Sequence, residues 1–258
     1  MSPAPTHYGR AFADYYNQHW QAFAEHSAPR LLAWYAHTEP GRQRLPVLDV
    51  GCGAGQLAQH FLAQGYAVTG LDLSPDMLAH AAANNAAAVA AGRARFEQAD
   101  AAAFTLGQRF GLVLSTFDVL NHLPDLEALR GCFRSVRAVL APGGRFVFDL
   151  NTRLGLQGWN SLGVYEADGV VVIQRRTFEA GAARALTSLT GFVPSPGGGY
   201  ERFDEAITNT VFEMEAVRQA LLDEGWSHVH TATLADLEAP LADPEQEGRV
   251  YFVARLEK

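Results

Sequence analysis

The fold of this chain is decided by the stretch VLDVGCGAGQL, which runs from Val47 to Leu57. Four residues with strand character lead into glycines at positions 51, 53 and 55, and an apolar-periodic segment follows at once. Glycine lets the backbone turn sharply and approach a ligand closely, so the pattern is typical of the strand–turn–helix opening of a Rossmann-like unit. The dinucleotide fingerprint G-x-G-x-x-G would need its third glycine at position 56, where this chain has Gln56. The stretch therefore predicts an α/β fold and disfavours a nicotinamide dinucleotide as the ligand.

Length and composition limit the class of protein. At 258 residues, with 48% hydrophobic and 19% charged residues, the chain fits one globular α/β domain, with or without an insertion. The net charge of −8 argues against non-specific binding of nucleic acid, which needs a basic face. Cys52 and Cys132 lack metal-ligand spacing, so we expect reduced thiols and no metal site. With neither a signal-peptide pattern nor an apolar run of membrane-spanning length, we expect a soluble, cytoplasmic protein without a membrane partner.

The segments after the glycine turn alternate between helix and strand. Residues 67–71 are predicted to form the second strand, which ends in Asp72. Asp72 follows Gly51 by about twenty positions, the offset typical of an acid that binds ribose. Ser74-Pro75 then begins a helix as its cap and first-turn residues. Further strands are expected at residues 95–98, 110–115, 145–150, 226–233 and 250–256, which predicts a seven-stranded, mostly parallel sheet flanked by helices.

The pattern changes to strands alone between residues 151 and 210. Three segments rich in β-branched and aromatic residues, 170–178, 184–193 and 200–211, are separated by turn-forming residues. This predicts an antiparallel β insertion after the fifth strand. The expected division is an N-terminal helical segment at 1–45, a core at 46–150 and 211–258, and an insertion at 151–210.

The first 45 residues carry an aromatic stripe at helical spacing. Packing against the sheet is the plain interpretation for most of the stripe. Its members are Tyr8, Phe12, Tyr15, Tyr16, Trp20 and Phe23.

Several motifs together resemble a known family. The form D-x-G-x-G-x-G, from Asp49 to Gly55, resembles motif I of the class I S-adenosylmethionine-dependent methyltransferases. The segment from Tyr8 to Asn17 resembles the Y-x-x-F-A-x-x-Y-D opening of many small-molecule members, with Asn17 where aspartate is usual. The L-x-P-G-G turn at 140–144 is also frequent in the family. The resemblance covers roughly residues 8–258, is strongest to small-molecule N-methyltransferases, and implies S-adenosylmethionine as the methyl donor. It also implies that the helical segment at 1–45 is a lid that closes over the cofactor and that the insertion at 151–210 forms the substrate side.

The resemblance also implies roles at the cofactor. Asp49 would act electrostatically on the positively charged methionine end, and Asp72 would accept hydrogen bonds from both ribose hydroxyls. Leu73 and Met77 would sandwich the adenine. Asp100 would accept a hydrogen bond from the adenine amino group, although an aspartate in a loop needs no ligand. The residues expected to bind the cofactor are Tyr16, Asp49, Gly51, Cys52, Gly53, Gly55, Asp72, Leu73, Met77, Asp100, Ala101, Ser115 and Phe117.

His122 is the candidate catalytic residue. It follows the fourth strand, and open α/β sheets bind their ligands at the carboxyl ends of strands. An imidazole with an ordinary pKa of about 6.5 suits proton removal near neutral pH. A base is needed only if the methyl acceptor arrives protonated. The alternative is a histidine that hydrogen-bonds the backbone or shapes the floor of the pocket.

The insertion is expected to choose the methyl acceptor. Asn121, Tyr200 and Arg202 are the residues expected to contact it, although the alternation from Tyr200 to Glu205 is also typical of a half-solvated antiparallel strand. The predicted function is transfer of a methyl group to a small molecule, at an amine nitrogen or alternatively at a hydroxyl or carboxyl oxygen. Two other functions stay open, a non-catalytic cofactor-binding module and a nicotinamide-dependent oxidoreductase. The protein is expected to be a monomer or a homodimer.

Overall fold

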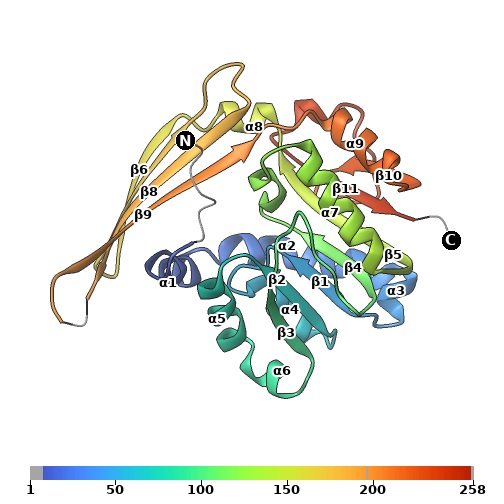
Figure 1. Cartoon of the computed structure of the whole chain (residues 1–258), viewed down its shortest axis with the longest axis horizontal. Coiled ribbons are helices and arrows are strands. Elements are labelled where there is room, and N and C mark those ends of the chain that lie inside the picture. The colour runs from blue at the N-terminus through green and yellow to red at the C-terminus, as the bar shows by residue number, and fades with distance from the viewer. Residues whose placement is uncertain (1–7, 196, 257–258) are drawn as a thin grey trace.

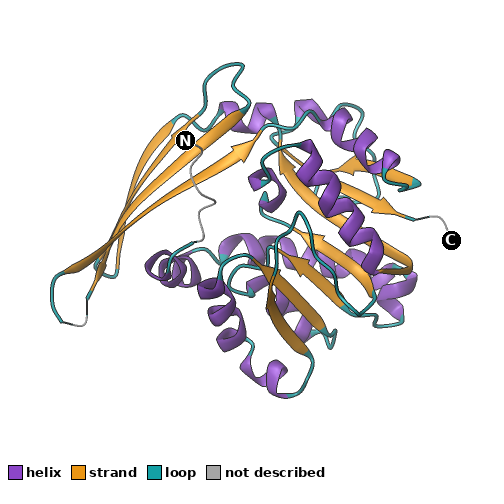
Figure 2. Ribbon diagram, in the orientation of Figure 1, coloured by secondary structure: helices purple, strands orange, loops and turns teal. Residues whose placement is uncertain are grey.

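A seven-stranded mixed sheet forms the centre of the molecule in the computed structural model, which describes residues 8–195 and 197–256 (Figures 1 and 2). The spatial order is β10-β11-β5-β4-β1-β2-β3, and β11 is antiparallel to both of its neighbours. The predicted fold class is therefore confirmed. The strands are β1 (Val47–Val50), β2 (Val68–Asp72), β3 (Ala94–Gln98), β4 (Phe110–Ser115), β5 (Leu140–Asn151), β10 (His228–Ala232) and β11 (Arg249–Arg255).

Helices cover both faces of this sheet because β1, β4 and β5 are buried on both sides. On one face, α2 (Ala22–His37) and α4 (Gln56–Ala63) pack against the sheet. On the other face lie α7 (Leu126–Val139) and α9 (Met214–Asp223). The remaining helices are α1 (Arg10–His19), α3 (Glu39–Arg42), α5 (Pro75–Asn84), α6 (Ala86–Ala90), α8 (Arg153–Gln157), and the short 3-10 helices η1 (Val119–His122) and η2 (Pro244–Gln246).

The helix predicted to begin at Ser74-Pro75 is divided into α5 and α6. Ser74 caps α5, and its hydroxyl accepts a hydrogen bond from the Met77 amide. The helix ends at Asn85, whose side-chain amide donates to the Gly55 carbonyl in the glycine turn. The Asn85 side chain, at the break between α5 and α6, thus connects the helix to the glycine turn.

A separate four-stranded antiparallel sheet lies between β5 and α9 in the chain, in the order β6-β7-β8-β9. Its strands are β6 (Ser161–Ala167), β7 (Val170–Thr177), β8 (Arg184–Pro194) and β9 (Tyr200–Thr210). Helix α1 packs on the inner face of this inserted sheet, where Phe12 joins Val172, Leu189 and Phe203 in one apolar cluster (Figure 1). The aromatic stripe therefore packs mainly against the inserted sheet and not against the central one, and Phe23 at the start of α2 stacks on Phe117.

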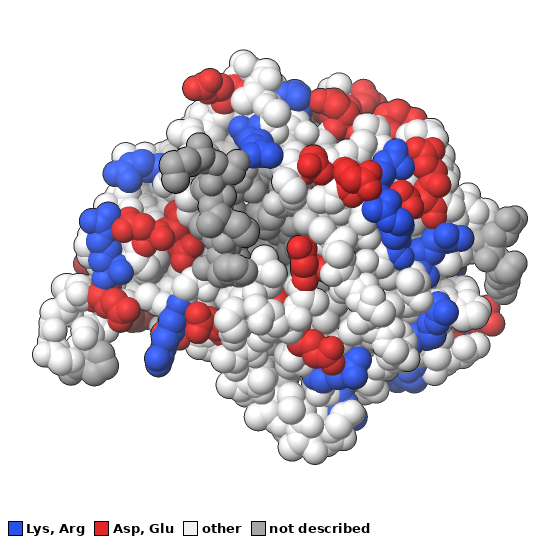
Figure 3. All heavy atoms as spheres, in the orientation of Figure 1, with Lys and Arg blue, Asp and Glu red and all other residues white. Residues whose placement is uncertain are grey.

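Lys and Arg side chains alternate with Asp and Glu side chains on the face shown in Figure 3. Several of these charges are paired on the surface, such as Arg134 with Glu127 and Arg218 with Glu215. In the described part of the chain, we find no helix with the length and apolar character needed to cross a membrane.

Candidate functional site

The glycine turn joins β1 to α4 in a conformation that side chains would obstruct. Gly51, Gly53 and Gly55 all have positive φ values, between 52° and 73°. A Cβ atom on Gly51 would lie 2.3 Å from Val119 in η1, and one on Gly55 would lie 2.8 Å from the Asn85 side chain. The turn is thus pressed between η1 and α5, which only glycine permits.

Asp72 lies at the end of β2, beside this turn. One of its carboxylate oxygens accepts the Gly53 amide at 2.8 Å, and the other accepts the Ser74 amide at 2.9 Å. Burial raises the pKa of Asp72, and these backbone hydrogen bonds oppose the rise. Each carboxylate oxygen can still accept a further hydrogen bond, so the group can receive two hydroxyls side by side.

Asp49 is a buried carboxyl group in β1, directly before the turn. Its side chain is 3% exposed, and Oδ2 has no hydrogen-bond partner among the described residues. Burial raises its pKa from 3.8 to about 7, and the neighbouring charge of Asp72 adds to the rise. A buried carboxylate with a free oxygen is costly unless a cation or a donor binds to it.

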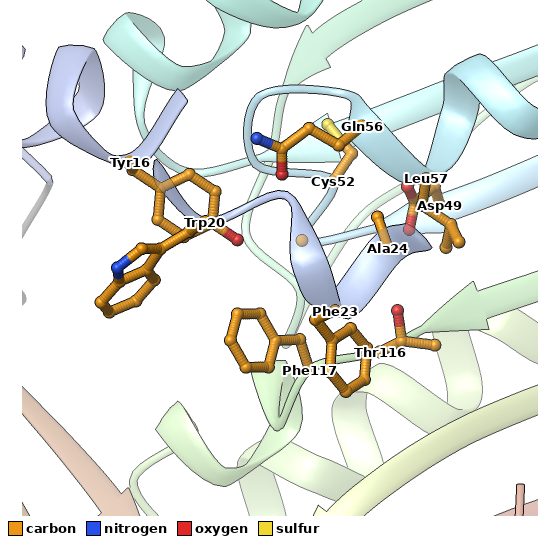
Figure 4. A pocket seen from close by; sticks show the side chains of 11 residues that line it. Tyr16, Trp20, Phe23, Ala24, Asp49, Cys52, Gln56, Leu57, Thr116 and Phe117 are labelled. Atoms are coloured by element: carbon orange, nitrogen blue, oxygen red, sulfur yellow. The ribbon is translucent and has the colours of Figure 1, made fainter. Parts of the chain in front are cut away.

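A cavity of about 30 Å³ adjoins Asp49 and the glycine turn (Figure 4). Aromatic rings of Tyr16, Trp20 and Phe23 from the helical N-terminal segment line the cavity. A Cβ atom on Gly53 would lie 3.5 Å from the Tyr16 ring. The volume is far below the roughly 300–1,000 Å³ of small-molecule sites, so the rings must move aside for a nucleoside. The cavity is lined by Tyr16, Trp20, Phe23, Ala24, Asp49, Gly51, Cys52, Gln56, Leu57, Thr116 and Phe117.

The loop after β4 forms the other side of the cavity. Phe117 stacks on Phe23 at a centroid distance of 4.4 Å, and Arg249 lies over both rings. Phe117 and Asp118 both have left-handed backbone conformations, with φ values of 67° and 52°. The buried carboxylate of Asp149 accepts both of their backbone amides.

His122 ends η1 on the surface, where it faces the base of β9. Its Nδ1 lies 3.1 Å from the Thr208 carbonyl oxygen. A carbonyl can only accept a hydrogen bond, so this contact requires a proton on Nδ1 and leaves Nε2 outside the contact. The adjacent Asn121 is fully buried and hydrogen-bonds the backbone of Asn151 and Thr210, which joins β5 to β9.

Of the other residues expected to bind the cofactor, some are exposed to solvent and some are buried. Leu73 is exposed at the end of β2, and Asp100 and Ala101 follow the adjacent end of β3. Met77 is 1% exposed and packs beneath α1. Ser115 is fully buried, and its hydroxyl donates to the Val50 carbonyl oxygen.

Tyr200 and Arg202, expected at the acceptor, lie away from this cavity. Tyr200 is 62% exposed and opens β9 beside Pro194. Arg202 is exposed and forms two hydrogen bonds with the Asp204 carboxylate. The structure therefore does not bring these two side chains together with His122 and Asp49.

Sequence reasoning missed two parts of the site. Trp20 and Phe23 are absent from the residues predicted to bind the cofactor, although both line the cavity together with Tyr16. Asp149 was missed as well, although a carboxylate inside the hydrophobic strand FVFDLN is a signal in itself. Arg249, which binds Asp149 and Asp118, carries no local signal at the start of β11.

Comparison with known proteins agrees with this geometry. A family model described as a methyltransferase domain matches residues 47–144. The dTDP-3-amino-3,4,6-trideoxy-alpha-D-glucopyranose N,N-dimethyltransferase of Streptomyces venezuelae is 31% identical over 71% of this chain and 78% of its own. The chain belongs to the class I S-adenosylmethionine-dependent methyltransferases.

Solved structures show the same architecture for this methyltransferase. An S-adenosylmethionine-dependent methyltransferase from Clostridium acetobutylicum superposes with a TM-score of 0.76, at 21% identity over 96% of this chain and 98% of that chain. A sugar N-methyltransferase from Streptoalloteichus gives the same score, at 22% identity over 100% and 97%. Family membership favours methyl transfer over the oxidoreductase and the non-catalytic module. The site residues named from the sequence stay predictions.

Proposed function

We propose that this methyltransferase transfers the methyl group of S-adenosylmethionine to the amine nitrogen of a small molecule held between His122 and the inserted sheet. The observation that carries the proposal is the buried Asp49 carboxyl group, with its free oxygen, next to a glycine turn bound by Asp72. A nucleoside that carries a cationic tail suits this pair of carboxylates. When bound, the cofactor supplies an activated methyl group on a positively charged sulfur.

The chain's residues would divide the work of binding the cofactor. The turn from Gly51 to Gly55 leaves room for the amino-acid tail, Asp49 attracts its ammonium group, and Asp72 accepts the ribose hydroxyls. Phe117 and Tyr16 exclude water from the reacting centre, which favours transfer of the methyl group to the acceptor rather than to water.

An amine acceptor is supported by the charges around the site. Burial raises the pKa of Tyr8, and Tyr16 and the negative charges of Asp72, Asp118 and Glu205 add to the rise. Such a surround attracts a cationic amine. The Nε2 lone pair of His122 would then remove a proton from the ammonium form or orient the free amine. N-methylation is also the activity named for the Streptomyces venezuelae relative and for a second relative from Streptomyces fradiae, 30% identical over 70% of this chain.

Calorimetry with S-adenosylhomocysteine tests the cofactor site. We expect binding to the parent protein, and we expect Asp72→Ala to lower the affinity by about 2–4 kcal/mol because charge-assisted hydrogen bonds to the ribose are lost. Asp76→Ala, in the first turn of α5, is the matched control and should bind as the parent does. Unchanged affinity in Asp72→Ala would place the ribose elsewhere.

The acceptor class is tested by a screen for S-adenosylhomocysteine release. Matched sets of amines, alcohols and carboxylic acids are offered with S-adenosylmethionine, and mass spectrometry locates the new methyl group. Turnover confined to amines supports the proposal. Turnover confined to alcohols or acids would contradict the amine assignment and leave the cofactor site unaffected.

A further inference from the structure

Two neighbouring residues of the cavity loop are held in an unfavourable backbone conformation. Phe117 and Asp118 have φ values of 67° and 52°. This region is unfavourable for residues other than glycine, and asparagine and aspartate tolerate it best. Such a conformation persists only where the surrounding structure holds it. The loop therefore depends on its neighbours for its shape.

The first of these neighbours belong to the central sheet. Asp149 in β5 accepts the Phe117 amide at 2.6 Å and the Asp118 amide at 3.1 Å. Arg249 in β11 binds the Asp149 carboxylate and also donates to Asp118 Oδ1 at 2.7 Å. Burial lowers the pKa of Arg249, but both carboxylates outweigh it and raise the pKa above its ordinary value. The Arg249 guanidinium is therefore charged and forms ion pairs with both Asp149 and Asp118.

The last neighbour comes from the inserted sheet. Asn209, near the end of β9, donates its side-chain amide to Asp118 Oδ2 at 2.8 Å. Asn209 is fully buried, and its Oδ1 has no hydrogen-bond partner among the described residues. This side chain therefore makes one directed contact, and that contact is with the cavity loop.

The residues on both sides of Asp118 adjoin the proposed cofactor site. Phe117 lines the cavity, and Val119 lies where a Cβ of Gly51 would clash with it. A displacement of Asp118 would shift both neighbours. The chain of contacts runs from β9 through Asn209 and Asp118 to the walls of the cavity.

We propose that Asn209 is a positioning residue, through which the inserted sheet sets the cofactor-binding geometry of the loop at Phe117–Val119. The inference rests on the proposed cofactor site at the glycine turn. It assigns the inserted sheet a part in cofactor binding in addition to its part in acceptor choice.

The proposal is tested by exchanging the hydrogen-bond donor at position 209 and the acceptor at position 118. Calorimetry then measures the affinity of each variant for S-adenosylhomocysteine. Asn209→Asp places two buried carboxylates against each other, and we expect the affinity to fall by about tenfold or more. The double variant Asp118→Asn/Asn209→Asp restores a donor–acceptor pair, keeps one acid for Arg249, and leaves asparagine at a φ that it tolerates. Its affinity should return to within about threefold of the parent's. Circular dichroism and a thermal melt establish that each protein is folded at the assay temperature.

Asn160→Asp is the matched control, because Asn160 in the insertion bonds only the Phe178 backbone. It should bind the ligand as the parent does, and Asp118→Asn should not improve it. If Asn209→Asp fails to fold, Asn209→Ala removes the same contact without adding charge and should weaken binding by about threefold to tenfold. Parent-like affinity in a folded Asn209 variant, or no recovery in the double variant, would overturn the inference. Absence of binding to the parent would instead overturn the proposed function.

Discussion

Asp49 combines a buried carboxyl group, a free oxygen and a neighbouring acid at one point of the cavity wall. Burial raises its pKa from 3.8 to about 7, with a further contribution from Asp72. In the empty protein the group is therefore mostly protonated below about pH 7 and ionised above it. A cationic ligand favours the ionised form, so binding at lower pH must release a proton.

The affinity for S-adenosylhomocysteine should therefore depend on pH in a defined direction. We expect it to rise with pH up to about 7, by as much as tenfold per unit, and to level off above that value. Asp49→Asn cannot ionise and should bind more weakly, with little pH dependence between about pH 5.5 and 8. Calorimetry in buffers of different ionisation enthalpy counts the protons released. An equal pH dependence in parent and variant would assign the titration to another group.

The two ring nitrogens of His122 have different proposed roles, because Nδ1 contacts the Thr208 carbonyl and Nε2 is proposed to face the acceptor. If Nε2 accepts a proton from the acceptor, His122→Asn should lower turnover by roughly 10²–10⁴, with little change in cofactor affinity. Asparagine retains a donor for the Thr208 carbonyl, so the base of β9 should remain in place. A single-turnover pH series on both proteins, once the acceptor is known, is the measurement. Full activity with the parent's pH profile would leave positioning alone to explain the rate.

At the scale of elements, α1 connects the inserted sheet to the cavity. Its first turn is fastened to β9, because the Gly9 amide donates to Glu205. Its last turn is fastened to α5, because Asn84 donates to Asn17 Oδ1 at 2.7 Å. The asparagine at the position where aspartate is usual thus serves as an acceptor here. Between these points Tyr16 occupies the cavity, so entry of the cofactor requires the end of α1 to shift.

Removal of the Tyr16 ring should change the kinetics of binding. Tyr16→Ala opens the cavity, so we expect association of S-adenosylhomocysteine to accelerate, and we expect dissociation to accelerate more because the ring no longer covers the ligand. Stopped-flow tryptophan fluorescence measures both rates, with Trp20 as a nearby reporter. Tyr15→Ala is the control, because Tyr15 points to Phe203 and should lower thermal stability while leaving both rates unchanged. A large loss of stability in Tyr16→Ala with unchanged rates would indicate a packing role.

Elements with strong local patterns were predictable from the sequence. The glycine turn, Asp72 and the strands of the central sheet follow from glycine spacing and buried apolar runs. Strand β6 was not predicted, because it lies at an edge with Leu162 and Val164 exposed, so burial does not impose a regular alternation. The positions of Tyr200 and Arg202 depend on which end and which face of β9 meet the core, and strand patterning does not determine either.

At the scale of the whole molecule, the cavity, α1 and the inserted sheet form one connected unit. Hydrogen exchange can follow the connection in the intact protein. On binding S-adenosylhomocysteine, we expect slower exchange in residues 10–23 and 117–122, and also at the base of β9 in residues 207–210, because Asn209 holds the loop. Residues 161–167 in the outer strand should be unaffected. Protection confined to the central sheet would show that the two sheets are not coupled.

The contacts of Arg249 with Asp149 and Asp118 could not be predicted from the sequence. Arg249 lies 100 residues from Asp149 and 131 residues from Asp118 in the chain. No periodicity or spacing links such positions, and only the insertion of β11 between β5 and β10 brings them together. The left-handed pair at Phe117–Asp118 could not be predicted either, because neither residue is a glycine.

The late position of Arg249 in the chain bears on how the protein is made. During translation, Asp118 and Asp149 leave the ribosome long before the guanidinium that neutralises them, and domains fold as their segments emerge. A nascent chain without β11 has two acids to bury and no cation for them, which favours water around the loop over the native contacts. The loop therefore takes its native shape only after β11 has entered the sheet. Cofactor in the surrounding solution therefore cannot assist folding before β11 has been made, because the loop beside its binding site is not yet in place.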